Sequence, residues 1–331
     1  MRVLDGVYQI KTPSPGGVAW DTNAYIIEGG DGHILIDSGW DSQEALYALQ
    51  EGIKGASLKL RDIRKLVVTH IHPDHYGLST KLKQICGSEV AIHRIDAGLI
   101  FARYRDFAGL LRKVEGILRQ NGVPEAELPQ LKEASLWMNK YVTTDSPEVK
   151  LEDGDTVSND SFELKVIWTP GHSPGHICLY ERERKFILTG DHVLFDTTPH
   201  VSYNPHSGEN PLGDYVSALN KLARLKVHFA LPGHGPVFNA LALRIDGIIQ
   251  HHEERKRAIM NSLGNGLKTA YAVAQEIPWT TGGTSTAFQD LAVWDRRMAV
   301  TETIAHLKQL ADEDRVGNVD MDGASLYISK D

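Results

Sequence analysis

The chain has 331 residues with ordinary globular proportions, 41% hydrophobic and 24% charged, which excludes disordered and fibrous classes. Its formal net charge of −8 argues against nucleic-acid binding through bulk positive charge. Two cysteines, Cys86 and Cys178, are too few for a disulfide framework and are typical of a reducing compartment. The sequence contains neither a signal-peptide pattern nor a run of 18 apolar residues, so we expect a cytoplasmic protein that does not enter a membrane.

Short apolar runs separated by turn residues predict strands in the first part of the chain. Residues 24–28 and 33–37 flank a Gly-Gly-Asp-Gly turn and predict a hairpin. Residues 66–69 predict a buried strand that leads directly into His70, and residues 87–93 predict another strand. Because helical segments alternate with these strands, the sequence predicts an α/β core.

The segment 95–145 differs, because it carries many large side chains at helical spacing. It predicts two or more helices inserted between strands. They could form the wall of a pocket for an apolar acyl chain, or they could only pack on the core or mediate a dimer.

Four further strands are expected, over residues 155–157, 164–167, 177–180 and 186–189. A helix over 213–225, a strand over 229–231 and a long helix over about 240–262 follow.

The end of the chain has a pattern of its own. A short helix beginning at Thr269, a longer one over 287–310 and a hairpin over 315–328 together suggest a winged-helix-like domain over 265–331, after a catalytic domain over 1–262. From residue 265 onward there are six Lys or Arg and ten Asp or Glu, a local net charge of −4. A DNA-reading wing normally has the opposite sign, so packing or homodimer formation is the preferred role.

Three histidines and a carboxylate lie within six positions in Thr69-His70-Ile71-His72-Pro73-Asp74-His75. Such a cluster after an apolar strand costs free energy unless something binds it. His70 and His72 alternate on an extended segment and can point to one side, whereas Asp74 and His75 follow a proline that turns the chain. This spacing suits two metal ions a few ångström apart. Imidazole and carboxylate ligands favour Zn²⁺, with Fe or Mn as alternatives.

Further ligands are expected at the tips of downstream loops. His172, Asp191 and His234 each follow a predicted strand, where α/β folds build their sites. His176 and His192 lie close to two of these candidates. We expect them to support a loop or line the pocket rim rather than to bind metal. His251 and His252 lie on a polar helix and are expected on its solvated face.

Taken together, these motifs resemble a known family, the metallo-β-lactamase-fold hydrolases. The resemblance covers roughly residues 5–240 and includes Leu35-Ile36-Asp37-Ser38-Gly39, the His-x-His-x-Asp-His motif and the three downstream residues in the same order. It implies an αββα sandwich with the metals at one edge between its sheets. The helical insertion and the winged-helix-like tail would be additions to that sandwich.

The resemblance also implies a role for each candidate. The first metal would be bound by three histidines, His70, His72 and His172. The second would be bound by Asp74, His75 and His234. Asp191 would bridge both metals. Asp37 and Thr69 would not bind metal themselves but would orient the ligands by hydrogen bonds, as residues next to metal ligands commonly do.

The reaction implied is hydrolysis by a hydroxide that bridges two zinc ions, which depress the pKa of bound water and polarise a carbonyl. Asp74 would orient the hydroxide and later carry a proton to the leaving group. True β-lactamases of this fold lack the aspartate that corresponds to Asp191, and flavodiiron relatives have glutamate in place of His72. Glyoxalase II, acyl-homoserine lactonases and related thioesterases share the full ligand set. We therefore expect a small-molecule ester, lactone or thioester as substrate.

Two alternatives stay open. The order of elements resembles a branch that includes a mitochondrial single-strand endoribonuclease, but the acidic tail weakens that interpretation and we expect no nucleic-acid partner. Iron-dependent persulfide dioxygenases share part of the motif.

Tyr203, Asn204 and His206 follow Asp191 on a loop rich in proline and glycine, and they could hydrogen-bond a substrate oxygen.

Overall fold

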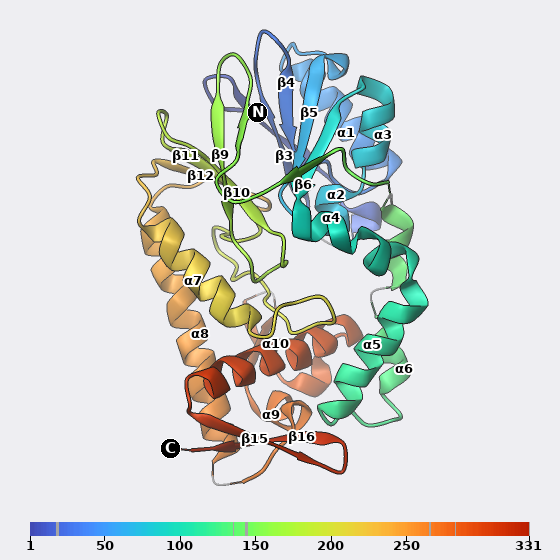
Figure 1. The fold of residues 1–331 in the computed structure, drawn as a ribbon, viewed down its shortest axis with the longest axis vertical. Helices are drawn as coiled ribbons and strands as arrows, with labels where there is room; N and C mark the ends of the chain where they lie inside the picture. Colours follow the sequence, from blue (N-terminus) through green and yellow to red (C-terminus); the bar gives the residue numbers. More distant parts are fainter. Residues whose placement is uncertain (18–19, 135, 143–144, 265, 282, 331) are drawn as a thin grey trace. The chain divides into compact units, whose positions relative to one another are not determined.

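The computed structural model describes residues 1–331 except 18–19, 135, 143–144, 265, 282 and 331. The chain forms two compact units that interleave along the sequence (Figure 1). The first unit consists of Met1–Arg105, Met138–Pro199 and Ala218–Ile245, and the second of Asp106–Trp137, His200–Ser217 and Asp246–Asp331. Residues 135, 143 and 144 of the expected insertion, and residues 265, 282 and 331 of the expected tail domain, lie outside the described residues.

The first sheet of the first unit contains seven strands among the described residues, in the order β1-β2-β3-β4-β5-β6-β7. Their bounds are β1 Arg2–Leu4, β2 Val7–Thr12, β3 Thr22–Ile27, β4 His33–Ile36, β5 Ile63–Val68, β6 Glu89–His93 and β7 Val149–Leu151. Neighbours from β1 to β4 are antiparallel, and those from β4 to β7 are parallel. The predicted hairpin is the pair β3–β4.

The second sheet has five strands within the described part of the chain, in the order β12-β11-β10-β9-β8. They are β8 Thr156–Ser158, β9 Glu163–Trp168, β10 Ile177–Glu181, β11 Phe186–Gly190 and β12 Phe229–Pro232. Strand β11 is antiparallel to β10 and parallel to β12. Helices of this unit are α1 Gln43–Gly55, α2 Pro73–Tyr76, α3 Ser79–Cys86 and α4 Arg94–Ile100, which continues into a π-helical turn over Phe101–Arg105.

Alternation along the strands of the first sheet divides its side chains between two apolar cores. On β3, Tyr25 and Ile27 face the second sheet, in a core shared with Leu164, Val166 and Leu179. The intervening Ile26 belongs to the opposite core, in which the first sheet meets the buried faces of α1 and α3. The first sheet is thus packed between a helical layer and the second sheet, as expected for an αββα sandwich.

Helices from the first and last segments of the second unit share one core. Leu118 of α5 (Phe107–Gln120) and Leu131 of α6 (Leu128–Glu133) are fully buried in one cluster with residues of α9 (Ala270–Glu276) and α10 (Val293–Asp312). Tyr327 joins the same cluster from the antiparallel pair β15 Val316–Met321 and β16 Ala324–Ser329. Two helices span both units in sequence, α7 (Pro211–Ala223) and α8 (Leu241–Leu263).

The tail contains the predicted short helix, long helix and hairpin, with Thr269 capping α9 through Ala272 N. It also contains a second hairpin that the sequence did not reveal, β13 Trp279–Thr281 with β14 Thr284–Thr286. The winged-helix assignment, the domain division after residue 262 and the homodimer stay predictions. Within the described residues, no helix combines the length and the hydropathy needed to cross a membrane.

Candidate metal centre

The site is built from loops that follow strands of both sheets in the first unit. Strand β5 ends at Val68, and the next residues carry His70 and His72. Pro73 begins the short helix α2 after an extended His72, and this turn separates the two histidines from Asp74 and His75. The downstream candidates follow β9, β11 and β12, and they are His172, Asp191 and His234.

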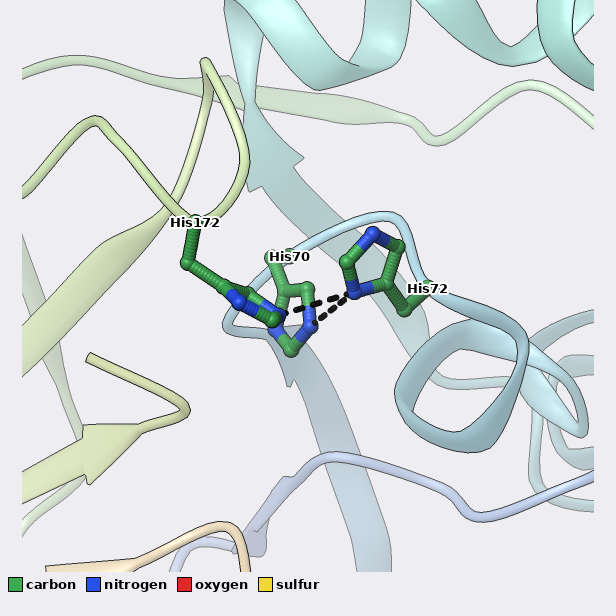
Figure 2. A group of neighbouring side chains, drawn as sticks. All are labelled: His70, His72 and His172. Atoms are coloured by element: carbon green, nitrogen blue, oxygen red, sulfur yellow. Dashed lines mark hydrogen bonds between the residues drawn. The ribbon is translucent and has the colours of Figure 1, made fainter. Parts of the chain in front are cut away.

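Three histidines form the first candidate group, and they come from two separate loops (Figure 2). Nδ1 of His72 lies 2.9 Å from Nε2 of His70 and 2.9 Å from Nε2 of His172. His70 is fully buried, whereas the other two are half-buried. Three ring nitrogens that face one point in this way can bind one metal ion.

The second candidate group combines two histidines with two carboxylates, Asp74, His75, Asp191 and His234. Oδ2 of Asp74 lies 3.5 Å from Nε2 of His75 and 3.2 Å from Nε2 of His234. In both groups, the candidate ligand atoms all lie within 4.8 Å of one another.

Asp191 lies between the two groups. Its Oδ2 atom is 4.0 Å from Nε2 of His70 and 3.6 Å from Nε2 of His172, both in the first group. The same carboxylate reaches the second group, with 3.4 Å from Oδ1 to Nε2 of His75 and 3.4 Å from Oδ2 to Nε2 of His234. A single carboxylate is thus within reach of both candidate metal positions.

Buried hydrogen bonds fix which ring nitrogen three of the histidines, His70, His75 and His234, present to the site. Nδ1 of His75 donates to Oδ2 of Asp37 over 2.7 Å. The Thr69 hydroxyl donates to the same Asp37 oxygen over 2.9 Å and lies 3.1 Å from Nδ1 of His70. Nδ1 of His234 donates to the backbone carbonyl of Asp21 over 2.9 Å. Each of these bonds leaves Nε2 directed at the site, which is the arrangement that metal-binding histidines use.

The donor set fits a bound cation. His75 Nε2 and Asp191 Oδ1 are buried, and neither has a hydrogen-bond partner among the described residues. Buried polar atoms without partners are rare, and metal coordination is one way to satisfy them. Burial lowers the pKa of His70 and of His72 well below the usual range, so both rings are neutral and keep a lone pair for a metal.

Charge in the second group points the same way. Burial alone would raise the pKa of Asp191, but His234 and His75 outweigh it and hold that pKa well below its usual value. Burial alone would lower the pKa of His75, and the carboxylates of Asp191, Asp74 and Asp37 together reverse the shift. The second group therefore places negatively charged carboxylates beside imidazole rings in a buried position, and this arrangement suits a divalent cation.

The structure also places the histidines that the sequence left in doubt. His176 is buried, its Nδ1 donates to the Thr169 hydroxyl over 2.7 Å, and its Nε2 accepts from Asp191 N over 3.1 Å. It thus supports the loop that carries Asp191. His192 is fully buried beside it, with ring centroids 5.6 Å apart, so it does not line a pocket rim. The expected exposure of His252 was wrong, because this side chain is 2% exposed and lies 3.1 Å from His306.

Two supporting residues escaped the sequence analysis. Asn23 donates through Nδ2 to the carbonyls of Pro232 and Gly235, on either side of His234, over 2.9 and 2.8 Å. Asp96 accepts hydrogen bonds from both loops of the three-histidine group. Each is a single polar residue in an ordinary strand or helix pattern, and no local signal marks its distant partner.

The expected substrate contacts Tyr203, Asn204 and His206 belong to the second unit. Tyr203 is partly buried against the core of that unit, and Lys308 Nζ lies 4.3 Å from its ring centroid. Oδ1 of Asn204 accepts from His206 N over 2.9 Å and so shapes its own turn. The role of these three residues in substrate binding stays a prediction.

A cluster of histidines and aspartates at one edge of two facing sheets defines this protein as a metallo-hydrolase of the αββα type. A family model described as the metallo-beta-lactamase superfamily matches residues 17–234. The chain therefore belongs to the metallo-beta-lactamase superfamily, as expected, and it is a hydrolytic enzyme.

Relatives extend the similarity over the whole chain. A probable metallo-hydrolase of Bacillus subtilis is 27% identical and aligned over 98% of each chain. A crystal structure of a metallo-beta-lactamase family protein from Thermus thermophilus matches with a TM-score of 0.82 and 27% identity, over 99% of this chain and all of the other. An acyl-coenzyme A thioesterase of Bos taurus is 30% identical over 66% of this chain and 74% of its own length.

Proposed function

We propose that this enzyme hydrolyses an ester-type acyl bond of a small molecule, with acyl thioesters as the first candidates among esters, lactones and thioesters. Two zinc ions are the proposed cofactors, one held by His70, His72 and His172 and the other by Asp74, His75 and His234. The observation that carries the proposal is the Asp191 carboxylate, which lies within 4.0 Å of a histidine nitrogen of the first group and 3.4 Å of two in the second.

The choice of acyl substrate rests on two further points. The Asp191 position argues against β-lactam hydrolysis, because true β-lactamases of this fold lack the corresponding aspartate. A relative that is 30% identical over 66% of this chain is an acyl-coenzyme A thioesterase, which supports a thioester substrate here.

The chain's own residues suit the chemistry of a thioesterase. When bound, the ions would lower the pKa of water at the site and polarise the substrate carbonyl. The water oxygen bonds to the acyl carbon, the carbon–sulfur bond breaks and the leaving sulfur takes up a proton. We assign that proton transfer to Asp74, whose side chain is 18% exposed against 11% for Asp191, so it is the carboxylate that a substrate reaches more easily.

A direct test is hydrolysis of a small panel by the zinc-loaded protein, with chelated protein as the blank. The panel holds acyl-coenzyme A thioesters of several chain lengths, an aryl ester, an N-acyl homoserine lactone and a phosphodiester. We expect thioester turnover that a chelator removes and added zinc restores.

Other outcomes would overturn the proposal in a defined direction. Cleavage of the phosphodiester alone would favour the endoribonuclease alternative. Oxygen uptake with a persulfide by the iron-loaded protein, without hydrolysis of any panel member, would favour the dioxygenase alternative.

A further inference from the structure

One buried carboxylate near the site belongs to neither candidate ligand group. Asp96 lies in the first turn of α4, directly after β6, and its exposed fraction is 0%. A carboxylate held this deeply in a protein requires several hydrogen-bond donors. The identity of its donors shows what it holds together.

Both oxygens of Asp96 bind loops that carry candidate ligands. Oδ2 accepts from Ile71 N over 2.8 Å, and Ile71 is the residue between His70 and His72. Oδ1 accepts from Gly175 N over 2.8 Å, three positions after His172. The Ser173 hydroxyl, next to His172, lies 2.7 Å from Oδ2 and 2.9 Å from Oδ1. One side chain therefore joins the two loops that Figure 2 shows meeting at the three imidazoles.

The close approach of the loop to Asp96 depends on a glycine. A Cβ atom at position 175 would lie 2.5 Å from Asp96 Oδ1 and 2.6 Å from Asp96 N. Any side chain there would push the loop away from the carboxylate. The sequence Ser173-Pro174-Gly175 thus supplies both a hydroxyl donor and the space for a backbone donor.

Other hydrogen bonds hold the His70–His72 segment and the His172 loop through their backbone carbonyls. The carbonyl of Ile71 accepts from the Tyr104 hydroxyl in the π-helical turn, so this peptide is held at both of its polar atoms. Trp168 Nε1 donates to the Pro174 carbonyl over 2.9 Å, and the indole ring stacks on His93 with centroids 5.7 Å apart. Asp96 is the member of this set that contacts both loops at once.

We propose that Asp96 is a positioning residue that sets the spacing of the His70–His72 segment and the His172 loop, and thereby the metal affinity of the three-histidine group. It differs from Asp37, which accepts hydrogen bonds from the His75 ring and from the backbone and hydroxyl of Thr69, because Asp96 joins the two loops of the three-histidine group to each other. The inference rests on the proposed assignment of that group as a metal site. It predicts a selective effect, because Asp96 has no hydrogen bond to the residues of the second group.

The decisive variant is Asp96→Asn, which keeps the shape but replaces one acceptor oxygen with an NH₂ group that cannot accept from a backbone N–H. Co²⁺ titration followed by visible absorption measures the metal sites without any substrate. We expect one Co²⁺ site to weaken by about 10–100-fold, the range found when outer partners of metal ligands are removed, and the other to stay unchanged. In a His72→Ala background, Asp96→Asn should cause no further change in the remaining site.

Asp160→Asn is the matched control, because Oδ1 of Asp160 also accepts a backbone hydrogen bond, from Gly30 N over 2.8 Å, but joins two hairpin turns. Its Co²⁺ titration should equal that of the wild type. If Asp96→Asn fails to fold by circular dichroism, Ser173→Ala takes its place, since it removes only the hydroxyl donor and should weaken the same site a few-fold.

Equal weakening of both sites, or no weakening of either, would overturn the positioning role. A wild-type protein that binds Co²⁺ but hydrolyses no panel substrate would instead overturn the proposed function and leave this inference intact.

Discussion

At the scale of single residues, Asp191 has the central place in the candidate site. It is buried and approaches histidine nitrogens of both ligand groups. Its backbone N–H donates a hydrogen bond to Nε2 of His176. Its Oδ1 atom is buried and has no hydrogen-bond partner among the described residues, so this oxygen is available for a metal ion. The Asp191 carboxylate is therefore placed to link the two groups, and its negative charge suits that place.

Asp191→Asn tests the proposed bridging role directly. The variant keeps the side-chain shape but removes the negative charge between the two groups, so metal content should fall and thioester turnover should drop by at least ~100-fold. Metal analysis and turnover of the purified variant, beside Asp160→Asn, measure both effects. Wild-type turnover in a preparation with full metal content would contradict the bridging assignment.

At the scale of elements, the site depends on how closely the strand-end loops approach one another. Gly233 follows β12, and its N–H donates to the carbonyl of Gly190 over 2.7 Å. A Cβ atom at position 233 would lie 2.3 Å from Asp191 Oδ1 and 2.8 Å from His75 Cε1. The loop needs glycine here for space.

Gly233→Ala should therefore displace Asp191 and His75 and weaken metal binding by about tenfold or more, at a cost of about 1–3 kcal/mol in the free energy of unfolding. Gly55→Ala in α1 is the control, since a Cβ atom there meets nothing within 4 Å. Co²⁺ titration and urea unfolding report the two quantities. Unchanged Co²⁺ affinity in Gly233→Ala would show that the loop can give way without moving the ligands.

The same elements show what the sequence could and could not predict. Apolar runs followed by Gly, Pro and His are local signals, and they correctly indicated that His172, Asp191 and His234 follow strands. Asn23 and Asp96 were missed because their partners lie far away in the sequence. Asn23 binds a carbonyl 209 positions away, and the nearest loop partner of Asp96 is 25 positions away, and no local pattern encodes such pairs. His252 was misjudged because its polar neighbours in sequence suggested a solvated face, whereas the residue packs against His306 of another helix.

At the scale of the whole molecule, the sequence showed that 95–145 and the tail are helical, but not which apolar faces meet. Helices α5 and α6 share a buried cluster with α9 and α10, although more than a hundred residues separate them. Amphipathic spacing reveals that a helix has an apolar face and leaves its partner unspecified. Such pairing is a property of the folded chain.

The second unit also contains a buried polar link that should tie its stability to pH. His306 is fully buried, its Nδ1 donates to the Glu302 carbonyl over 2.9 Å, and its Nε2 accepts from His252 Nδ1 over 3.1 Å. Burial lowers the pKa of His306 from near 6.5 to about 4, against the opposing effect of Glu302. Between those two values the unfolded chain binds a proton that the folded chain does not, so stability falls as pH decreases from about 6.5 towards 4.

His306→Gln should remove this contribution, because glutamine offers one acceptor and one donor in place of the two ring nitrogens and does not titrate. Between pH 7 and pH 5, the wild type should lose about 2 kcal/mol more unfolding free energy than the variant. Urea unfolding of the chelated proteins, followed by tryptophan fluorescence, measures the difference, and Trp279 reports from the same core. The histidines of the metal centre contribute to both proteins, so their effect cancels in the comparison. Equal losses in the two proteins would mean that His306 takes up a proton in the folded state as readily as in the unfolded one, and that the buried link does not couple this unit to pH.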